Sequence, residues 1–127
     1  MFKFPFRRHA TILGLVTAAL LAGHAPCSFA NDYATILMYH RFGEDRYPST
    51  NVTLEQFEEH LEILASGPYS VMPLDEVVEH LQAGKPLPDR SVAITIDDAY
   101  LSVFEEAFPR LKERGFTATL FIATRPV

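Results

Sequence analysis

Two adjacent aspartates follow a segment that has the composition of a buried strand. Residues 91–96 are rich in β-branched and apolar side chains, and Asp97 and Asp98 come directly after them. Paired carboxylates can divide the work of hydrolysis, because one can bind a divalent cation while the other takes a proton from water. An Asp-Asp pair at a strand end is about as often a turn with a helix N-cap. The spacing alone leaves both interpretations open.

His40 occupies the matching position after the first apolar run. Residues 34–39 are nearly all apolar, which is typical of a strand buried on both faces of a parallel sheet. We interpret His40 as a candidate substrate-binding residue or a support for the metal site, and a turn-capping histidine is the alternative. His60 and His80 lie on amphipathic segments rich in glutamate, where solvated helix faces are the simpler interpretation.

The elements that would position these residues follow from the spacing of apolar side chains. Thr53 and Gln56 have capping-box spacing at the start of the first expected helix, and Pro109 is expected to break or kink the third. Gly84 and Gly115 close the second and third helices. The pattern predicts strands over residues 34–39, 69–72, 91–96 and 117–123 and helices over 54–65, 74–81 and 101–114.

This alternation predicts an α/β fold with right-handed βαβ units around a parallel sheet, with chemistry beyond the carboxyl ends of the strands. An open sheet and a barrel give the same pattern. Four strands and three helices would make about half of a β/α barrel, which typically needs roughly 200 residues or more. The sequence stops just past the last expected strand, so we expect it to be a truncated part of a longer protein.

The first thirty residues differ from the rest. Lys3, Arg7 and Arg8 precede an uncharged run over 11–23, and Ser28-Phe29-Ala30 suits cleavage after Ala30. The apolar run is shorter than the ~20 residues needed to span a bilayer, which disfavours the alternative of an uncleaved anchor. We expect a signal peptide over 1–30, a single domain over 31–127, and export to the periplasm or the cell exterior, with membrane contact only during export.

Charge and cysteine content exclude several function classes. The expected signal peptide contains three of the 11 basic residues and none of the 16 acidic ones, so the remainder carries a net charge near −8. Such a chain has no electrostatic footprint for nucleic acid. The only cysteine, Cys27, lies in the expected signal peptide, so no disulfide, thiolate nucleophile or cysteine metal site is expected in the mature domain.

The segment around the aspartate pair resembles a known family. Residues 92–100, Val-Ala-Ile-Thr-Ile-Asp-Asp-Ala-Tyr, are similar to the first signature motif of the polysaccharide deacetylases, T-F-D-D-G/A. Met38-Tyr39-His40 resembles the M-Y-H of one branch of that family, and residues 108–111 and 115–121 resemble the segment after the motif. Ile96 replaces the usual phenylalanine, and Ala99 stands where glycine is often found.

The resemblance implies a fold, an activity and roles for individual residues. The fold would be the N-terminal part of a distorted (β/α) barrel of the polysaccharide deacetylase type. Asp97 would be the catalytic base and Asp98 a ligand of a divalent metal ion, with zinc expected and cobalt, nickel or iron as alternatives. Thr95 would be structural. The protein would remove N- or O-linked acetyl groups from an acetylated polysaccharide or cell-wall glycan, as a hydrolase of carbon–nitrogen but not peptide bonds.

The resemblance also implies that the family's H-x-x-x-H metal pair and general-acid histidine lie beyond residue 127. A catalytic zinc site usually has three protein ligands, so we expect the 127-residue chain alone to be inactive.

Two other interpretations remain open. Receiver domains and aspartate phosphatases also place carboxylates around magnesium at strand ends. The expected signal peptide argues against a receiver, and a phosphatase would need D-x-D spacing that Asp97 and Asp98 lack. The alternative from another class is a noncatalytic glycan-binding protein or an inactive fragment of the same fold.

Overall fold

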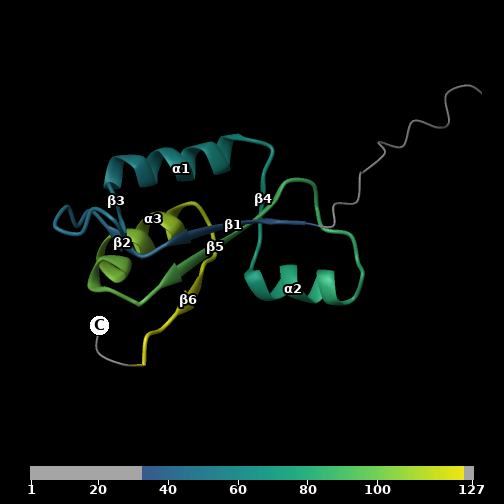
Figure 1. The fold of residues 1–127 in the computed structure, drawn as a ribbon. Coiled ribbons are helices and arrows are strands. Elements are labelled where there is room, and N and C mark those ends of the chain that lie inside the picture. The colour runs from purple at the N-terminus through teal and green to yellow at the C-terminus, as the bar shows by residue number, and fades with distance from the viewer. Residues whose placement is uncertain (1–32, 125–127) are drawn as a thin grey trace, which may run out of the picture.

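The computed structural model describes residues 33–124, so the expected signal peptide lies outside the described residues. A four-stranded sheet is built around β5 (Ser91–Asp97), and every strand pair in it is parallel. β1 (Thr35–Tyr39) pairs along β5, β4 (Ser70–Val71) pairs with its start and β6 (Thr119–Phe121) with its end (Figure 1). The predicted α/β architecture with a parallel sheet is therefore confirmed.

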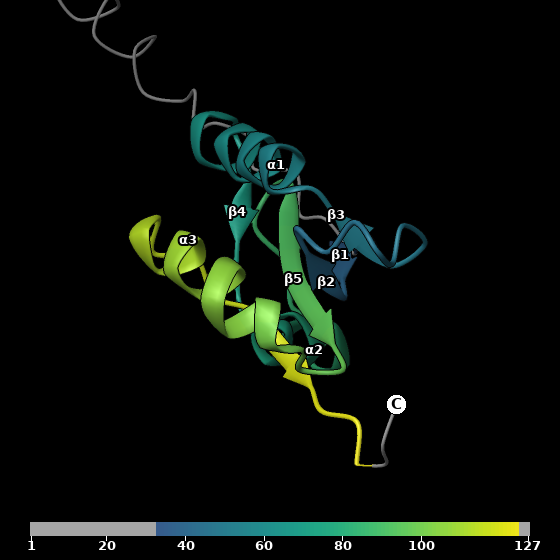
Figure 2. The same cartoon turned by 90° about the vertical axis from the view of Figure 1, so that its left-hand side faces the viewer.

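Helices cover both faces of β5. α1 (Leu54–Ser66) and α3 (Phe108–Glu113) contribute to the main core, together with alternate β5 residues, whereas α2 (Leu74–Gln82) packs over Ala93 on the other face (Figure 2). Successive strand residues point to opposite faces, so a strand buried on both sides needs the continuous apolar run that β5 has. No helix within residues 33–124 is long and apolar enough to cross a membrane.

The helix ends confirm the sequence signals. The Thr53 hydroxyl accepts a hydrogen bond from the Gln56 amide at 3.1 Å, and the Gln56 side chain accepts from the Thr53 amide, which completes the predicted capping box. Gly115 has φ +67°, and the amide of Phe116 donates to the carbonyl of Leu111. This Schellman closure brings the Phe116 ring back against the core.

Pro109 does not break the third helix in two. Residues 101–113 are helical throughout, but one turn, η1 (Val103–Ala107), is a π-helix, with the Phe108 amide bonded to the Val103 carbonyl. A proline inside an α-helix has no amide to donate and collides with the carbonyl four residues earlier. The wider π turn directly before Pro109 accommodates the ring without a break, so of the two predicted outcomes, a break or a kink, the break is wrong.

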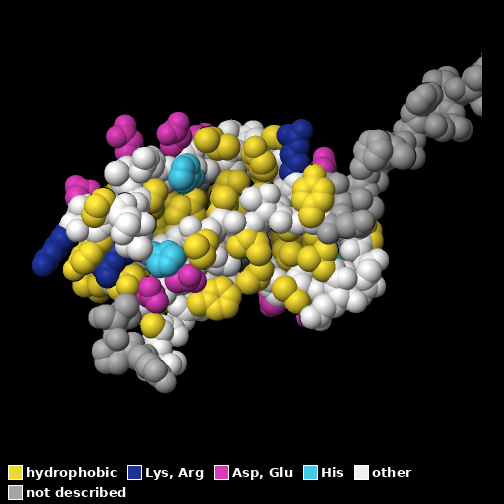
Figure 3. All heavy atoms as spheres, viewed as in Figure 1, with side chains coloured by type: hydrophobic (Ala, Val, Ile, Leu, Met, Phe, Trp, Pro, Cys, Tyr) yellow, Lys and Arg dark blue, Asp and Glu magenta, His cyan; other side chains and the backbone are white. Residues whose placement is uncertain are grey.

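The composition of β1 predicts that the strand is buried on both faces, but only one of its faces is buried. Leu37 and Tyr39 pack against the main core, but Ile36 and Met38, on the opposite face, are 53% and 63% exposed. Within the described residues β1 pairs with β5 alone, and no helix covers Ile36 and Met38. Figure 3 shows hydrophobic side chains gathered along the face on which β1 lies in Figure 1.

Two short strands lie within residues 40–53, for which the sequence predicts neither a strand nor a helix. β2 (Arg41–Phe42) and β3 (Asn51–Val52) form a small parallel sheet directly after β1. Phe42 is 1% exposed and packs on Phe57 of α1, with ring centroids 4.7 Å apart. This contact anchors the chain between β1 and α1 beside the end of β5.

Candidate functional site

The two aspartates lie at a tight turn that ends the central strand. Asp97 is the last residue of β5, and the Asp98 amide donates to the Phe121 carbonyl of β6 at 2.8 Å. Asp98 and Ala99 have φ values of +70° and +51°, a left-handed conformation that costs non-glycine residues energy. Thr95, predicted to be structural, is buried in β5 beneath the turn. Both carboxylates are half-buried, so they reach solvent from a fixed backbone.

The sheet register brings His40 to Asp97. Tyr39 of β1 is paired with Ile96 of β5, so the residues that follow them leave the same edge of the sheet side by side. His40 Nε2 lies 3.7 Å from Asp97 Oδ2, and about a quarter to a third of each side chain is exposed. The distance is too long for a direct hydrogen bond but short enough for an ion pair when the imidazole is protonated.

Asp98 contacts a different group of residues. The Tyr100 hydroxyl donates to Asp98 Oδ2 at 3.2 Å, and the guanidinium of Arg41 lies 3.3 Å from the centroid of the Tyr100 ring. The ring of Tyr47 is 4.0 Å from the same guanidinium. The Arg41 guanidinium therefore lies over two aromatic rings, a favourable cation–π arrangement.

A buried hydroxyl completes this group. Glu44 accepts a hydrogen bond from Arg41 Nη1 at 2.6 Å and another from the Ser102 hydroxyl at 2.6 Å. Ser102 is 7% exposed and accepts from the Phe42 amide. The Ser102 hydrogen bond, aided by the charge of Arg41, lowers the pKa of Glu44 despite its partial burial. Burial acts to lower the pKa of Arg41, but the contacts with Glu44 and Tyr100 outweigh it and raise that pKa.

The donor chemistry of the turn fits a hard or borderline divalent cation. Asp98 offers a half-buried carboxylate held by the neighbouring tyrosine, and ligating carboxylates are usually supported in this way. Residues 33–124 bring together no group of three or more His, Cys, Asp or Glu side chains that could hold a metal ion. The described residues thus fit part of a metal site, and further ligands would have to come from outside them.

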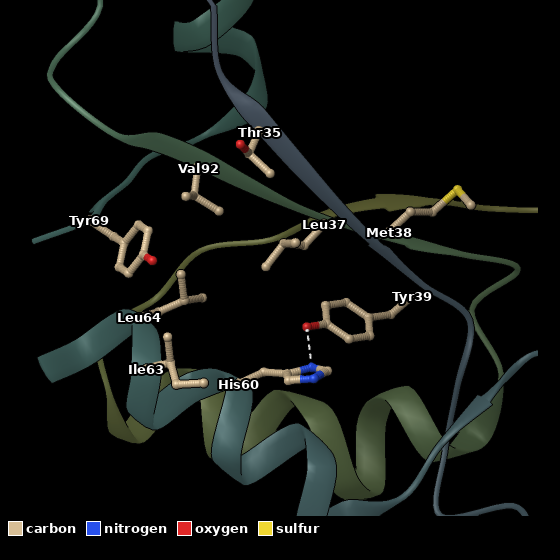
Figure 4. Close-up of a pocket in the computed structure, with 9 residues that line it drawn as sticks. All are labelled: Thr35, Leu37, Met38, Tyr39, His60, Ile63, Leu64, Tyr69 and Val92. Carbon is tan, nitrogen blue, oxygen red and sulfur yellow. Dashed lines mark hydrogen bonds between the residues drawn. The ribbon is translucent and has the colours of Figure 1, made fainter. Parts of the chain in front are cut away.

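The most prominent pocket lies away from the aspartates. It is an apolar groove of about 500 Å³ between β1 and α1, whose wall includes Leu37, Ile63 and Tyr69 (Figure 4). The Tyr39 hydroxyl and His60 Nδ1 are 3.0 Å apart at its edge, and burial raises the pKa of Tyr39. A smaller pocket of about 260 Å³ lies between His40 and β3, next to the candidate site.

The other two histidines have partners of their own. His60 is exposed, as predicted for a helix face, but contacts the Tyr39 hydroxyl. His80 is half-buried, and its Nδ1 donates to the carbonyl of Pro86 at 2.9 Å. His80 thus lies on a helix face, as predicted, and the turn after α2 covers part of its ring.

Four residues beside the aspartates were not predicted from sequence: Arg41, Glu44, Tyr100 and Ser102. Glu44 and Ser102 are 58 positions apart, and nothing in their local spacing indicates that they meet. The sequence feature that could have indicated this group is Tyr100, an aromatic residue two positions after Asp98.

Comparisons with known proteins agree with the sequence resemblance. A family model described as polysaccharide deacetylase matches residues 84–127, a range that includes both aspartates. The chain is 32% identical over 92 residues to YxkH of Bacillus subtilis, whose name assigns it provisionally to the polysaccharide deacetylases. It is 29% identical over 97 residues to the poly-beta-1,6-N-acetyl-D-glucosamine N-deacetylase of Staphylococcus epidermidis.

These alignments cover 72% and 76% of this chain but only 32% of either relative. The chain thus spans about a third of the length of the curated relatives that it matches.

Solved structures share the fold. IcaB from Ammonifex degensii superposes with a TM-score of 0.63 at 30% sequence identity, over 73% of this chain and 39% of that one. The deacetylase PplD of Streptococcus pyogenes, solved in complex with acetate, gives a TM-score of 0.63 at 24% identity, over 72% of this chain and 42% of its own. At 24% identity, the match to PplD shows a shared fold and nothing more.

Proposed function

We propose, from the premise that this chain belongs to the polysaccharide deacetylase family, that the protein containing it is a metal-dependent hydrolase that removes acetyl groups from a polysaccharide. The observation that supports this proposal most directly is the Asp97–Asp98 turn at the end of the central strand, with His40 of the neighbouring strand 3.7 Å from Asp97. The turn places two half-buried carboxylates where a parallel sheet presents its chemistry.

The two aspartates would have different roles. Asp97 would act as the general base, taking a proton from the water that attacks the acetyl carbonyl carbon. His40, beside Asp97, would hold that carboxylate or contact the substrate. Asp98, supported by Tyr100, would bind the cation. A divalent cation bound there would polarise the carbonyl and lower the pKa of the attacking water.

The metal identity and the remainder of the site belong to the same proposal. Zinc is the first candidate, with cobalt, nickel or iron as alternatives, because a carboxylate alone selects weakly among them. The other metal ligands and the acid that protonates the leaving group would come from outside residues 33–124. We likewise propose that the parallel sheet is part of a distorted (β/α) barrel and that residues 1–30 direct export to the periplasm or the cell exterior.

Poly-N-acetylglucosamine is the substrate to test first. Relatives in Staphylococcus epidermidis and Staphylococcus aureus are named poly-beta-1,6-N-acetyl-D-glucosamine N-deacetylases, the latter 36% identical over 74 residues. An exported enzyme would also meet such glycans outside the cytoplasm.

The test is acetate release from a β-1,6-linked N-acetylglucosamine oligomer by the product of the complete reading frame, with added zinc or cobalt. Asp97→Asn should lower kcat at least ~100-fold, because general-base catalysis contributes about that much or more. Asp98→Asn should weaken metal binding. Asp45→Asn, an exposed aspartate between β2 and β3, should leave the rate unchanged.

If the Asp97→Asn variant kept wild-type activity, Asp97 would not be the general base. A wild-type protein that releases no acetate from several N- and O-acetylated glycans but still binds them would favour the noncatalytic glycan-binding alternative. The 127-residue chain, measured in parallel, shows whether these residues suffice for catalysis.

A further inference from the structure

We infer that Arg41 and Tyr100 are positioning residues that hold the carboxylate of Asp98 in one orientation, so that the segment between β2 and β3 determines how well this aspartate binds a cation. The inference rests on the proposed function for the cation, but the restraint on the carboxylate is a property of the described residues alone. It assigns a role to side chains other than the two aspartates themselves.

The restraint is a continuous series of contacts from the core to Asp98. The Phe42 amide donates to the buried Ser102 hydroxyl, which donates to Glu44 at 2.6 Å. Glu44 accepts from Arg41 at 2.6 Å, and the Arg41 guanidinium lies 3.3 Å from the centroid of the Tyr100 ring. The contacts end where the Tyr100 hydroxyl donates to Asp98 Oδ2.

Asp98 needs such a restraint because its backbone conformation is not its preferred one. Both Asp98 and Ala99 have positive φ, and such residues keep this conformation only when their surroundings fix it. The hydrogen bond from the Asp98 amide to Phe121 fixes the backbone from the β6 side. The described hydrogen bond to the side chain comes from Tyr100, so the aromatic ring has to be fixed as well.

Arg41 is suited to fix that ring. Its planar guanidinium stacks on Tyr100 and Tyr47 and binds Glu44 at the same time, which a lysine ammonium cannot reproduce. The arginine side chain is 15% exposed, and the adjacent Phe42 is buried in the core. The backbone of Glu44 is held in turn by Asn51 of β3, whose side chain accepts from the Glu44 amide at 2.8 Å. The β2–β3 segment is thus held by several contacts on the side that faces Tyr100.

The test uses two readouts on the same set of variants. The first is the χ1 rotamer of Asp98, read without metal from three-bond couplings to its β-protons by NMR. The second is the cobalt dissociation constant of the complete protein, measured by chelator competition. Tyr100→Phe keeps the ring and removes the hydroxyl, Arg41→Lys keeps the charge and removes the planar stack, and Tyr47→Phe is the matched control that keeps its ring on Arg41.

The expected result is a single Asp98 rotamer in the wild type and in Tyr47→Phe, and rotamer averaging in Tyr100→Phe and Arg41→Lys. Cobalt binding should weaken roughly tenfold or more in the last two variants, the usual effect of losing a residue that supports a metal ligand. Circular dichroism verifies that each variant folds, and Arg41→Gln replaces Arg41→Lys if that variant does not.

An averaged rotamer in the wild type, or an unchanged rotamer in Tyr100→Phe, overturns the inference. A wild type that fixes Asp98 but binds no cobalt overturns the proposed metal chemistry and leaves the positioning role supported. The two proposals therefore fail on different measurements.

Discussion

Asp98 and Ala99 show how a single turn can set the properties of a site. The chain has to reverse sharply after β5 so that the aspartates stay at the sheet edge while the helix beginning at residue 101 runs back. It does so with two successive residues at positive φ, a conformation usually left to glycine. Asp98 tolerates it because short polar side chains are among those that visit this region. Alanine has no polar side chain to help it adopt this conformation, and the similar motif of the polysaccharide deacetylases often has glycine at this position.

Ala99→Gly should therefore raise the free energy of unfolding by about 0.5–1 kcal/mol, because relief of left-handed strain outweighs the greater freedom of glycine in the unfolded chain. Urea denaturation followed by circular dichroism measures the difference. Arg90, also at φ +51° but exposed and at the opposite end of β5 from the aspartates, provides the matched comparison through Arg90→Gly. A loss of stability in both variants would contradict the strain argument.

At the scale of elements, the β2–β3 segment and the third helix are linked through one carboxylate. Glu44 binds Arg41 of β2 and Ser102 at the start of the helix, and these contacts lower its pKa. A carboxylate whose pKa is lower in the folded state stabilises the fold at pH values above its unfolded pKa. That contribution disappears as the pH falls through the folded pKa, where both states become protonated.

Glu44→Gln should accordingly be less stable than the wild type at pH 7, by roughly 1.5 kcal/mol, the low end of the usual range for a hydrogen bond to a charged group. The difference in the free energy of unfolding should shrink as the pH is lowered below 4.5, the ordinary pKa of a glutamate side chain. Urea denaturation at pH 7, 5 and 3.5 measures it. The exposed Glu105 supplies the control, since Glu105→Gln should follow the wild type at each pH. A difference that stays constant with pH would refute the role of the charge.

For the described residues as a whole, most of the buried apolar side chains lie on one side of the sheet. The larger core joins α1, α3 and the Val92, Ile94 and Ile96 face of β5, whereas much of the surface beyond β1 and β6 is apolar and open to solvent. α1 shows the contrast within one helix, because Leu61 is fully buried and Ile63, two residues later, is 49% exposed.

Leu61→Ala should cost about 2–5 kcal/mol of the free energy of unfolding, since it removes a packed side chain and leaves a cavity. Ile63→Ala should change it by less than about 1 kcal/mol, because that side chain is half exposed and alanine is the better helix former. Chemical denaturation of both variants tests the comparison. Equal losses would mean that the face of α1 carrying Ile63 is also covered.

The sequence by itself determined the order and type of the main elements, the capping box of α1 and the position of the aspartates at the end of β5. These features depend on residues that are close together in the chain, so periodicity and capping residues predict them. The sequence also indicated the family through the segment around Asp97 and Asp98. It misjudged β1, since an apolar run predicts that a strand is buried but cannot say which neighbours cover it.

Only the tertiary structure decided which side chains meet around the aspartates. The pairing of Tyr39 with Ile96 brings His40 to Asp97, and the contact of Ser102 with Glu44 joins residues 58 positions apart. It also decided that a π turn accommodates Pro109. Such contacts depend on strand register and on packing between distant segments, and the physical forces that select them act only once the whole core has assembled.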